Sequence, residues 1–264
     1  MVKIQVDDIK INYKQMGNGF PLVMIHGLND NLENWDPNLI RELSKKYRLI
    51  LFDVPGSGRS ELSNKEPSIK LFAEETSSLL DILGISKAHV LGLSLGGMIA
   101  QEIVLNYPEK VEKLILCSTN CGGSRVIPPS MEVIQQLSGN RTNLSPEDLV
   151  RNSVRILFTN EFIENNSDYI ENHIQRRLSS PVTEKGLVGQ QRAIMNFSTY
   201  ERLPKIKTPT LILHGKKDVM IPPQNSSILA GAIPNSNLVY LENSAHFLAE
   251  EVEKLLQIIL EFLE

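Results

Sequence analysis

One serine of this chain lies in a pattern that suits nucleophilic attack. Residues 92–96 read Gly-Leu-Ser-Leu-Gly, which places Ser94 between two glycines. Residues 87–91 predict a short buried strand, and residues 95–106 predict a helix. A strand that turns into a helix through this pattern forces the serine into a strained conformation, so that its hydroxyl stands clear at the strand tip. The N–H of Leu95 then points to the place where an oxyanion would form.

A serine hydroxyl is a weak nucleophile at neutral pH and needs a base that takes its proton. Among the five histidines, His246 lies in a loop after the last predicted strand. In a parallel sheet the loops after the strand ends share one edge, the edge that also bears Ser94. We therefore predict that His246 is the base. The other histidines belong to a His-Gly turn, to strands or to a helix: His26, His89, His214 and His173.

The base in turn needs a carboxylate that orients it. Asp218 follows the predicted strand 211–213 and precedes His246 by enough residues for one helix and one strand. Glu242 is the alternative, but it stands at a strand end, where a surface position is expected. We predict Asp218 as the orienting acid.

The bulk composition sets limits on the class of protein. The chain has 264 residues, 41% of them hydrophobic and 22% charged, as in an ordinary globular protein. Its net charge of −4 and its lack of a basic run argue against nucleic acid and membrane surfaces as partners. The N-terminus lacks the apolar run of a signal peptide, so a cytoplasmic protein is expected. The expected assembly is a monomer or a homodimer.

The order of apolar runs and helical stretches predicts an α/β fold. Residues 3–17 predict a hairpin, and residues 21–120 alternate short apolar runs with helices of about a dozen residues. That pattern predicts a mainly parallel sheet covered on both faces. Residues 121–203 read as successive helices, including one over residues 161–178, and the sheet pattern resumes at residue 210. The simplest organisation is a core of residues 1–120 and 204–264 with a helical insertion of residues 121–203.

Taken together, these motifs resemble those of the α/β-hydrolase fold superfamily, in the group of capped esterases, enol-lactonases and cofactor-free haloperoxidases. The resemblance rests on motifs that occur in the expected order: His26-Gly27, residues 53–60, residues 92–97, residues 215–218 and His246. It implies a sheet of about eight strands, with the insertion as a cap over the active site. Two departures concern the path of the histidine loop. Ala245 stands where relatives often carry glycine, and no proline follows in residues 247–251.

The resemblance further implies a catalytic triad of Ser94, Asp218 and His246, with the N–H groups of Leu28 and Leu95 as the oxyanion hole. We expect hydrolysis of carboxylic esters with a short or medium acyl chain, without a metal or organic cofactor. Lactone hydrolysis, carbon–carbon bond hydrolysis and perhydrolysis on the same triad remain open, as does a slow-turnover receptor for a small ligand. Candidate walls of the substrate pocket are Trp35, Met220, Ile221 and Phe247. A cationic clamp for a dicarboxylate substrate could come from Arg176 or Arg192.

Overall fold

The computed structural model describes residues 2–138, 144–180 and 183–264. Eight strands form one sheet in the order β1-β2-β4-β3-β5-β6-β7-β8. β1 and β2 form the predicted hairpin and β2 pairs with β4 antiparallel, whereas all other pairs are parallel. The strands span Val2–Val6 (β1), Ile9–Met16 (β2), Phe20–Ile25 (β3), Tyr47–Phe52 (β4), Ala88–Leu93 (β5), Val111–Cys117 (β6), Thr210–Gly215 (β7) and Ser236–Leu241 (β8).

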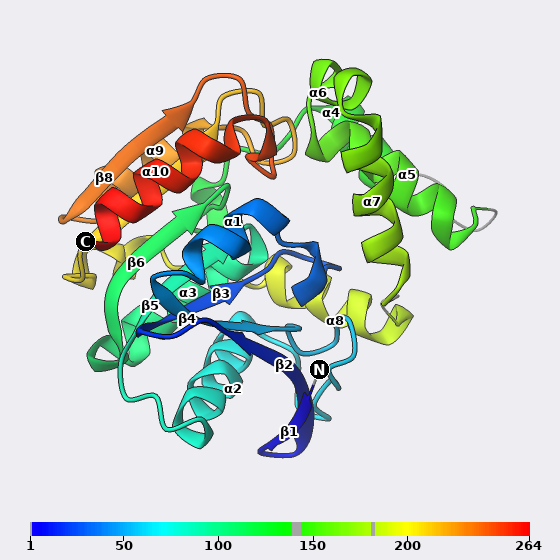
Figure 1. Ribbon diagram of the computed structural model, residues 1–264. Helices are drawn as coiled ribbons and strands as arrows, with labels where there is room; N and C mark the ends of the chain where they lie inside the picture. Colours follow the sequence, from blue (N-terminus) through cyan, green and yellow to red (C-terminus); the bar gives the residue numbers. More distant parts are fainter. Residues whose placement is uncertain (1, 139–143, 181–182) are drawn as a thin grey trace.

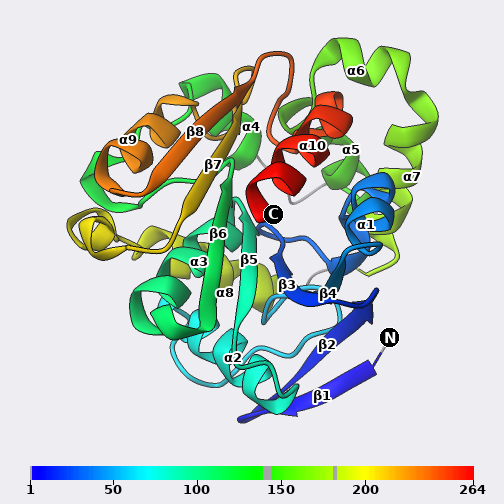
Figure 2. The ribbon, with the colours of Figure 1, turned by 60° about the vertical axis from the view of Figure 1, so that its left-hand side comes forward.

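Helices cover both faces of the sheet, as the near-continuous apolar strands predict. Alternate residues of β3 serve the two faces: Val23 and Ile25 pack with α2, α3 and α9, while Leu22 and Met24 pack with α1 and α10. Figure 2 shows these two helical layers on opposite sides of the sheet. The helices span Pro37–Leu43 (α1), Ile69–Ile82 (α2), Leu95–Asn106 (α3), Gln224–Ala232 (α9) and Val252–Leu263 (α10).

Between β6 and β7 the described residues form five α-helices, which we call the helical insertion. They span Met131–Ser138 (α4), Pro146–Leu157 (α5), Asn160–Asn165 (α6), Ser167–Leu178 (α7) and Glu184–Met195 (α8). The single helix predicted over residues 161–178 is wrong, because Asn166 has φ −133° and ψ 48° and divides it into α6 and α7. Asparagine competes with the helical backbone for hydrogen bonds, which favours such a break.

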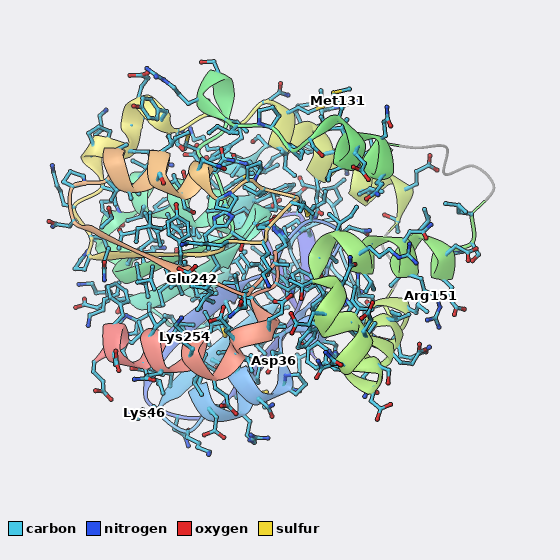
Figure 3. The ribbon with its side chains drawn as sticks, turned by 90° about the horizontal axis from the view of Figure 1, so that it is seen from above. Asp36, Lys46, Met131, Arg151, Glu242 and Lys254 are labelled. Atoms are coloured by element: carbon cyan, nitrogen blue, oxygen red, sulfur yellow. The ribbon has the colours of Figure 1, made fainter. Side chains whose placement is uncertain are left out.

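The helical insertion lies over the edge of the sheet where the parallel strands end (Figure 1). Its inner side has an apolar cluster of its own, built from α5 and α7 residues such as Leu157 and Ile174, which packs on Phe247 and Ala249 of the core. Its outer side carries exposed groups such as Met131 and Arg151 (Figure 3). Within the described residues, no helix combines the length and the apolar character needed to cross a membrane.

Candidate active site

Ser94 occupies the sharp turn between β5 and α3 that the sequence predicts. Its backbone has φ 56° and ψ −116°, a conformation that is strained for a residue with a side chain. Neighbouring strands hold the turn, because the Ser94 N–H donates to the Cys117 carbonyl at 2.9 Å and the Thr119 hydroxyl donates to the Ser94 carbonyl at 2.7 Å. A Cβ atom on Gly96 would lie 2.0 Å from the Ile25 carbonyl oxygen, so the turn requires glycine there.

Asp218 and His246 come together although they follow different strands. Nδ1 of His246 lies 2.8 Å from Oδ2 of Asp218, and both side chains are buried. Their loops are bonded to each other, since the N–H of Lys216 donates to the Leu241 carbonyl and the N–H of Lys217 donates to the Ser244 carbonyl. Ala245 and the missing proline after His246 therefore do not prevent the contact between the His246 imidazole and the Asp218 carboxylate.

The environment of Asp218 keeps its carboxyl group ionised. Burial alone would raise the pKa of Asp218, but the charge of His246 and hydrogen bonds from both His246 and His214 outweigh it and hold the pKa at about 2. The other oxygen, Oδ1, accepts the N–H groups of Met220 and Ile221, each at 2.9 Å. The carboxylate is therefore fixed in charge and in orientation at neutral pH.

His214 is an additional neighbour of this acid that the sequence analysis left as a strand end. Its Nε2 lies 2.8 Å from the Ile221 carbonyl and 3.1 Å from Oδ2 of Asp218. Because a carbonyl and a carboxylate only accept, Nε2 of His214 carries a proton. The spacing of four residues between His214 and Asp218 across a strand end was the signal that could have suggested this contact.

The two expected oxyanion donors come from two different segments, of which Leu95 directly follows Ser94 and Leu28 lines the same cavity as Ser94. Leu95 is the first residue of α3, and Leu28 lies in the loop after β3. A Cβ atom built on Gly27 would lie 3.3 Å from the Cβ of Ser94, which shows how closely this loop, residues 27–30, approaches the serine. We call it the oxyanion loop below.

Ser94 and His246 line one cavity of about 220 Å³ between the core and the helical insertion. Two predicted wall residues, Met220 and Phe247, line it as well. The insertion contributes apolar side chains from α5 and α8 together with polar groups: Ser153, Ile156, Leu157, Arg177, Leu187 and Gln191. The cavity wall thus combines apolar side chains with polar ones, and it holds one cationic side chain and one carboxylate, Asp30.

That cation is Arg177 of α7, which the sequence analysis missed in favour of Arg176 and Arg192. Its guanidinium donates to the Ser153 hydroxyl at 2.8 Å and to the Asn29 carbonyl at 3.2 Å. A signal existed, because Arg177 continues the buried stripe of Ile170, His173 and Ile174 at helical spacing. Arg192 instead lies at the surface, 3.6 Å from Glu66.

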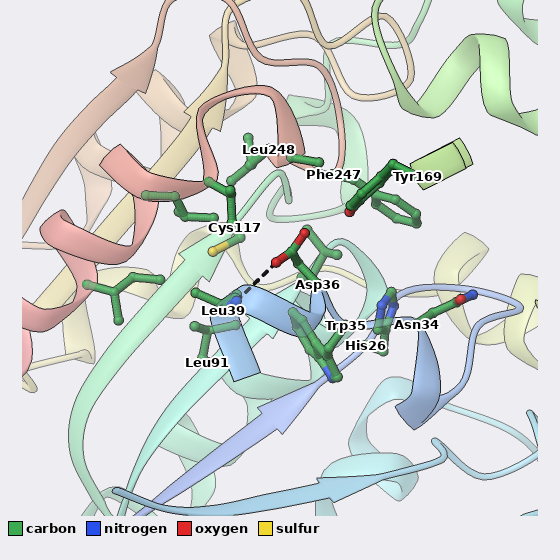
Figure 4. A pocket seen from close by; sticks show the side chains of 15 residues that line it. His26, Asn34, Trp35, Asp36, Leu39, Leu91, Cys117, Tyr169, Phe247 and Leu248 are labelled. Carbon is green, nitrogen blue, oxygen red and sulfur yellow. Dashed lines mark hydrogen bonds between the residues drawn. The ribbon is translucent and has the colours of Figure 1, made fainter. Parts of the chain in front are cut away.

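Trp35 and Ile221, the other predicted wall residues, stand elsewhere. Trp35 lines a smaller cavity of about 30 Å³ with His26 and Tyr169, and Phe247 borders both cavities (Figure 4). Ile221 supports the acid through its backbone, as described above. Glu242, the alternative acid, forms a surface ion pair with Lys216 at 2.8 Å, away from His246.

His26 holds the oxyanion loop, as its His-Gly turn suggested. Its Nδ1 accepts the Gly27 N–H at 2.8 Å and lies 3.4 Å from Asp30. Burial alone would raise the pKa of Asp30, but His26 and Arg177 outweigh it and hold that pKa below its usual value. His89 and His173 are buried, and desolvation lowers the pKa of His89 to about 4 and that of His173 to about 3.

Comparison with known proteins agrees with this architecture. The model of the family described as the alpha/beta hydrolase fold matches residues 21–251. The chain therefore belongs to the alpha/beta hydrolase family, and it is a hydrolase by that membership.

Its relatives act on different substrates. A 2-hydroxy-6-oxononadienedioate/2-hydroxy-6-oxononatrienedioate hydrolase of Pseudomonas putida is 30% identical, and the match covers 97% of this chain and 92% of that protein. A poly(3-hydroxyalkanoate) depolymerase of Ectopseudomonas oleovorans is also 30% identical, over 92% of this chain and 84% of its own length. Among solved structures, a malate-bound thermophilic esterase of Thermogutta terrifontis superposes with a TM-score of 0.83 at 26% identity, covering 99% of this chain and 97% of that one.

Proposed function

We propose that this protein hydrolyses carboxylic esters with a short or medium acyl chain, using Ser94 as nucleophile, His246 as base and Asp218 as orienting acid. One observation carries the proposal: the bonded His246–Asp218 pair and the strained serine turn open into the same cavity. The hydrogen bond between a catalytic serine and its base is often long in the free enzyme and becomes short only when substrate binds.

The reaction then follows acyl transfer to water. Ser94 Oγ bonds to the ester carbonyl carbon while His246 Nε2 takes its proton, and the carbonyl electrons move to oxygen. The Leu28 and Leu95 N–H groups stabilise that oxyanion, with about 3 kcal/mol for each donor. The alkoxide leaves with the proton from His246, and a water molecule activated by the same imidazole releases the acid and restores Ser94.

The helical insertion serves in this proposal as a cap, with residues 121–203 as its extent. Leu157, Leu187 and Phe247 would surround the acyl chain, because they line the cavity beside Ser94. An apolar wall stabilises an alkyl chain by about 0.8 kcal/mol for each buried methylene. This supports short and medium acyl esters over strongly polar ones.

The direct test is Ser94→Ala on a series of p-nitrophenyl esters from acetate to octanoate. We expect kcat to fall about 10⁴-fold with the fold retained, because nucleophile and base act as one unit. Labelling by a fluorophosphonate should be lost in the same variant. Wild-type turnover that stays at the uncatalysed rate across the series, with Ser94 labelled once, would instead favour a slow-turnover receptor.

A second candidate is hydrolysis of a carbon–carbon bond or lactone in a substrate that carries a carboxylate. Arg177 in the cavity wall favours it, and the Pseudomonas putida relative is named for a dioate substrate. Arg177→Met should raise KM for mono-p-nitrophenyl succinate about tenfold relative to the uncharged butyrate ester, because a charge-assisted hydrogen bond contributes roughly 1.5–3 kcal/mol. Equal changes for both esters would argue against a carboxylate site.

A further inference from the structure

Gln190 of α8 links the helical insertion to two loops of the core. Its amide is fully buried: Oε1 accepts the Asn29 N–H at 3.1 Å, and Nε2 donates to the Pro55 carbonyl at 3.1 Å. A buried amide with a bond on each side is a fixed group, because breaking either bond leaves an unpaired polar atom away from water.

Asn29, which donates its N–H to Gln190, belongs to the oxyanion loop. Asn29 directly follows Leu28, whose N–H is the proposed oxyanion donor, and it has φ 58°, in the left-handed region. Such a conformation persists only where the surroundings impose it. Both backbone groups of Asn29 bond to the insertion, the N–H to Gln190 and the carbonyl to Arg177. The insertion therefore fixes the peptide on each side of Asn29, and the Leu28–Asn29 peptide directly follows the Gly27–Leu28 peptide that carries the Leu28 N–H.

The helix that carries Gln190 is seated against the core without room to shift. Gly186, one turn before Gln190, packs backbone to backbone on Gly56, and a Cβ atom at Gly186 would lie 1.8 Å from the Gly56 carbonyl oxygen. Gly189 faces the side chains of Leu62 and Pro67, which a Cβ atom there would meet at 3.1 and 3.3 Å. α8 is thus a close-packed support from which Gln190 reaches the loop.

We propose that Gln190 is a positioning residue for the oxyanion hole, holding the Leu28 N–H toward the reacting carbonyl through its bond to Asn29. The proposal rests on the proposed function of Ser94. In this arrangement the insertion shapes the cavity and also completes the group that stabilises the transition state.

The test is Gln190→Met, which keeps the side-chain length and removes both bonds. We expect kcat for p-nitrophenyl butyrate to fall between about 10-fold and 10²-fold, because the donor is displaced but still present. KM should stay within about twofold. The Ki of a trifluoromethyl ketone, which forms a tetrahedral oxyanion on the serine, should rise by the same factor as kcat falls.

Two further variants separate positioning from folding. Gln190→Glu keeps an acceptor for the Asn29 N–H and, as the neutral acid that full burial favours, a donor for the Pro55 carbonyl, so kcat and Ki should remain within about threefold of wild type. Gln101→Met is the matched control, because Gln101 is equally buried and bonds to Gly97, Asn120 and Thr199 but not to the oxyanion loop. It should lower Tm and leave kcat and Ki per active site unchanged.

The outcomes are distinct. If Gln190→Met lowers Tm but changes neither kcat nor Ki per fluorophosphonate-titrated site, Gln190 is merely structural and the proposal fails. If that variant does not fold, a folded Gln190→Glu with a large fall in kcat and a large rise in Ki overturns the proposal, because the Asn29 bond is retained there. A wild-type protein without ester turnover would refute the proposed function instead, before any variant is compared.

Discussion

Replacing Asp218 with asparagine should abolish most activity by reversing the proton arrangement on His246. Oδ1 of Asp218 accepts two backbone N–H groups, from Met220 and Ile221. These donors require an oxygen, so the new amide must keep its oxygen there and place its NH₂ group where Oδ2 stood, 2.8 Å from Nδ1 of His246. An NH₂ group only donates, so Nδ1 has to accept and the proton moves to Nε2. That nitrogen can then no longer take the proton of Ser94.

The expected loss in kcat is about 10⁴-fold, which corresponds to roughly 5 kcal/mol of activation free energy. The fold should survive, because the shape and both backbone bonds of the acid are kept. The NH₂ group would also face the protonated Nε2 of His214, which lies 3.1 Å from Oδ2. One unfavourable buried contact of this kind should lower the free energy of unfolding by about 1 kcal/mol.

The assay is steady-state hydrolysis of p-nitrophenyl butyrate at pH 7.5, with Tm measured on the same samples. Glu242→Gln is the matched control, since Glu242 is the alternative carboxylate and forms only a surface ion pair. Its kcat should stay within about twofold of wild type. A folded Asp218→Asn protein with kcat within tenfold of wild type would refute the role of Asp218, and a large loss in Glu242→Gln would move that role to Glu242.

Two further changes test the support of the site and the pH dependence of stability. Gly186→Ala would place a Cβ atom 1.8 Å from the Gly56 carbonyl oxygen, so α8 would have to move away from the core. We expect kcat to fall roughly 10-fold to 10²-fold as a result. A variant that retains the wild-type kcat would count against a rigid α8. Burial raises the pKa of the Glu75 carboxyl group from 4.5 to about 8. Between these two pH values the folded protein holds a proton that the unfolded chain releases. The free energy of unfolding therefore falls as the pH rises from 4.5 to about 8. Glu75→Gln should therefore gain up to ~3 kcal/mol at pH 7 and almost nothing at pH 4, a difference that urea unfolding at both pH values would detect.

The proposed catalytic residues could be brought to one edge from the sequence because the sheet topology fixes where they lie. Ser94, Asp218 and His246 each follow a strand of a parallel run, and parallel strands end at one edge. The residues around Ser94 also predicted the geometry of its turn. The flanking glycines are required because a side chain at either position would collide with nearby backbone atoms wherever this turn forms. The eight-stranded sheet followed from the same alternation of short apolar runs and helices.

The cavity wall could not be placed in the same way. Which side of an insertion helix faces Ser94 depends on how that helix packs on the core. The stripe of residues 170, 173, 174 and 177 indicates a buried side of α7, but not what that side faces. Gln190 gave no signal at all, because its partners Asn29 and Pro55 are far away along the chain. Trp35 entered the prediction as a candidate wall of the substrate pocket, yet it lines the smaller cavity, next to the N-cap of α1 at Asp36.

The contacts between insertion and core bear on how substrate reaches Ser94. The oxyanion loop is bonded to Gln190 and Arg177, and the histidine loop is tied to the insertion as well, because Glu250 accepts the N–H groups of both Ala245 and Thr159. A motion that lifted the whole insertion would break all of these bonds and disturb both loops at once. Lifting the insertion as one body is therefore incompatible with the bonded arrangement of the two loops around the proposed site.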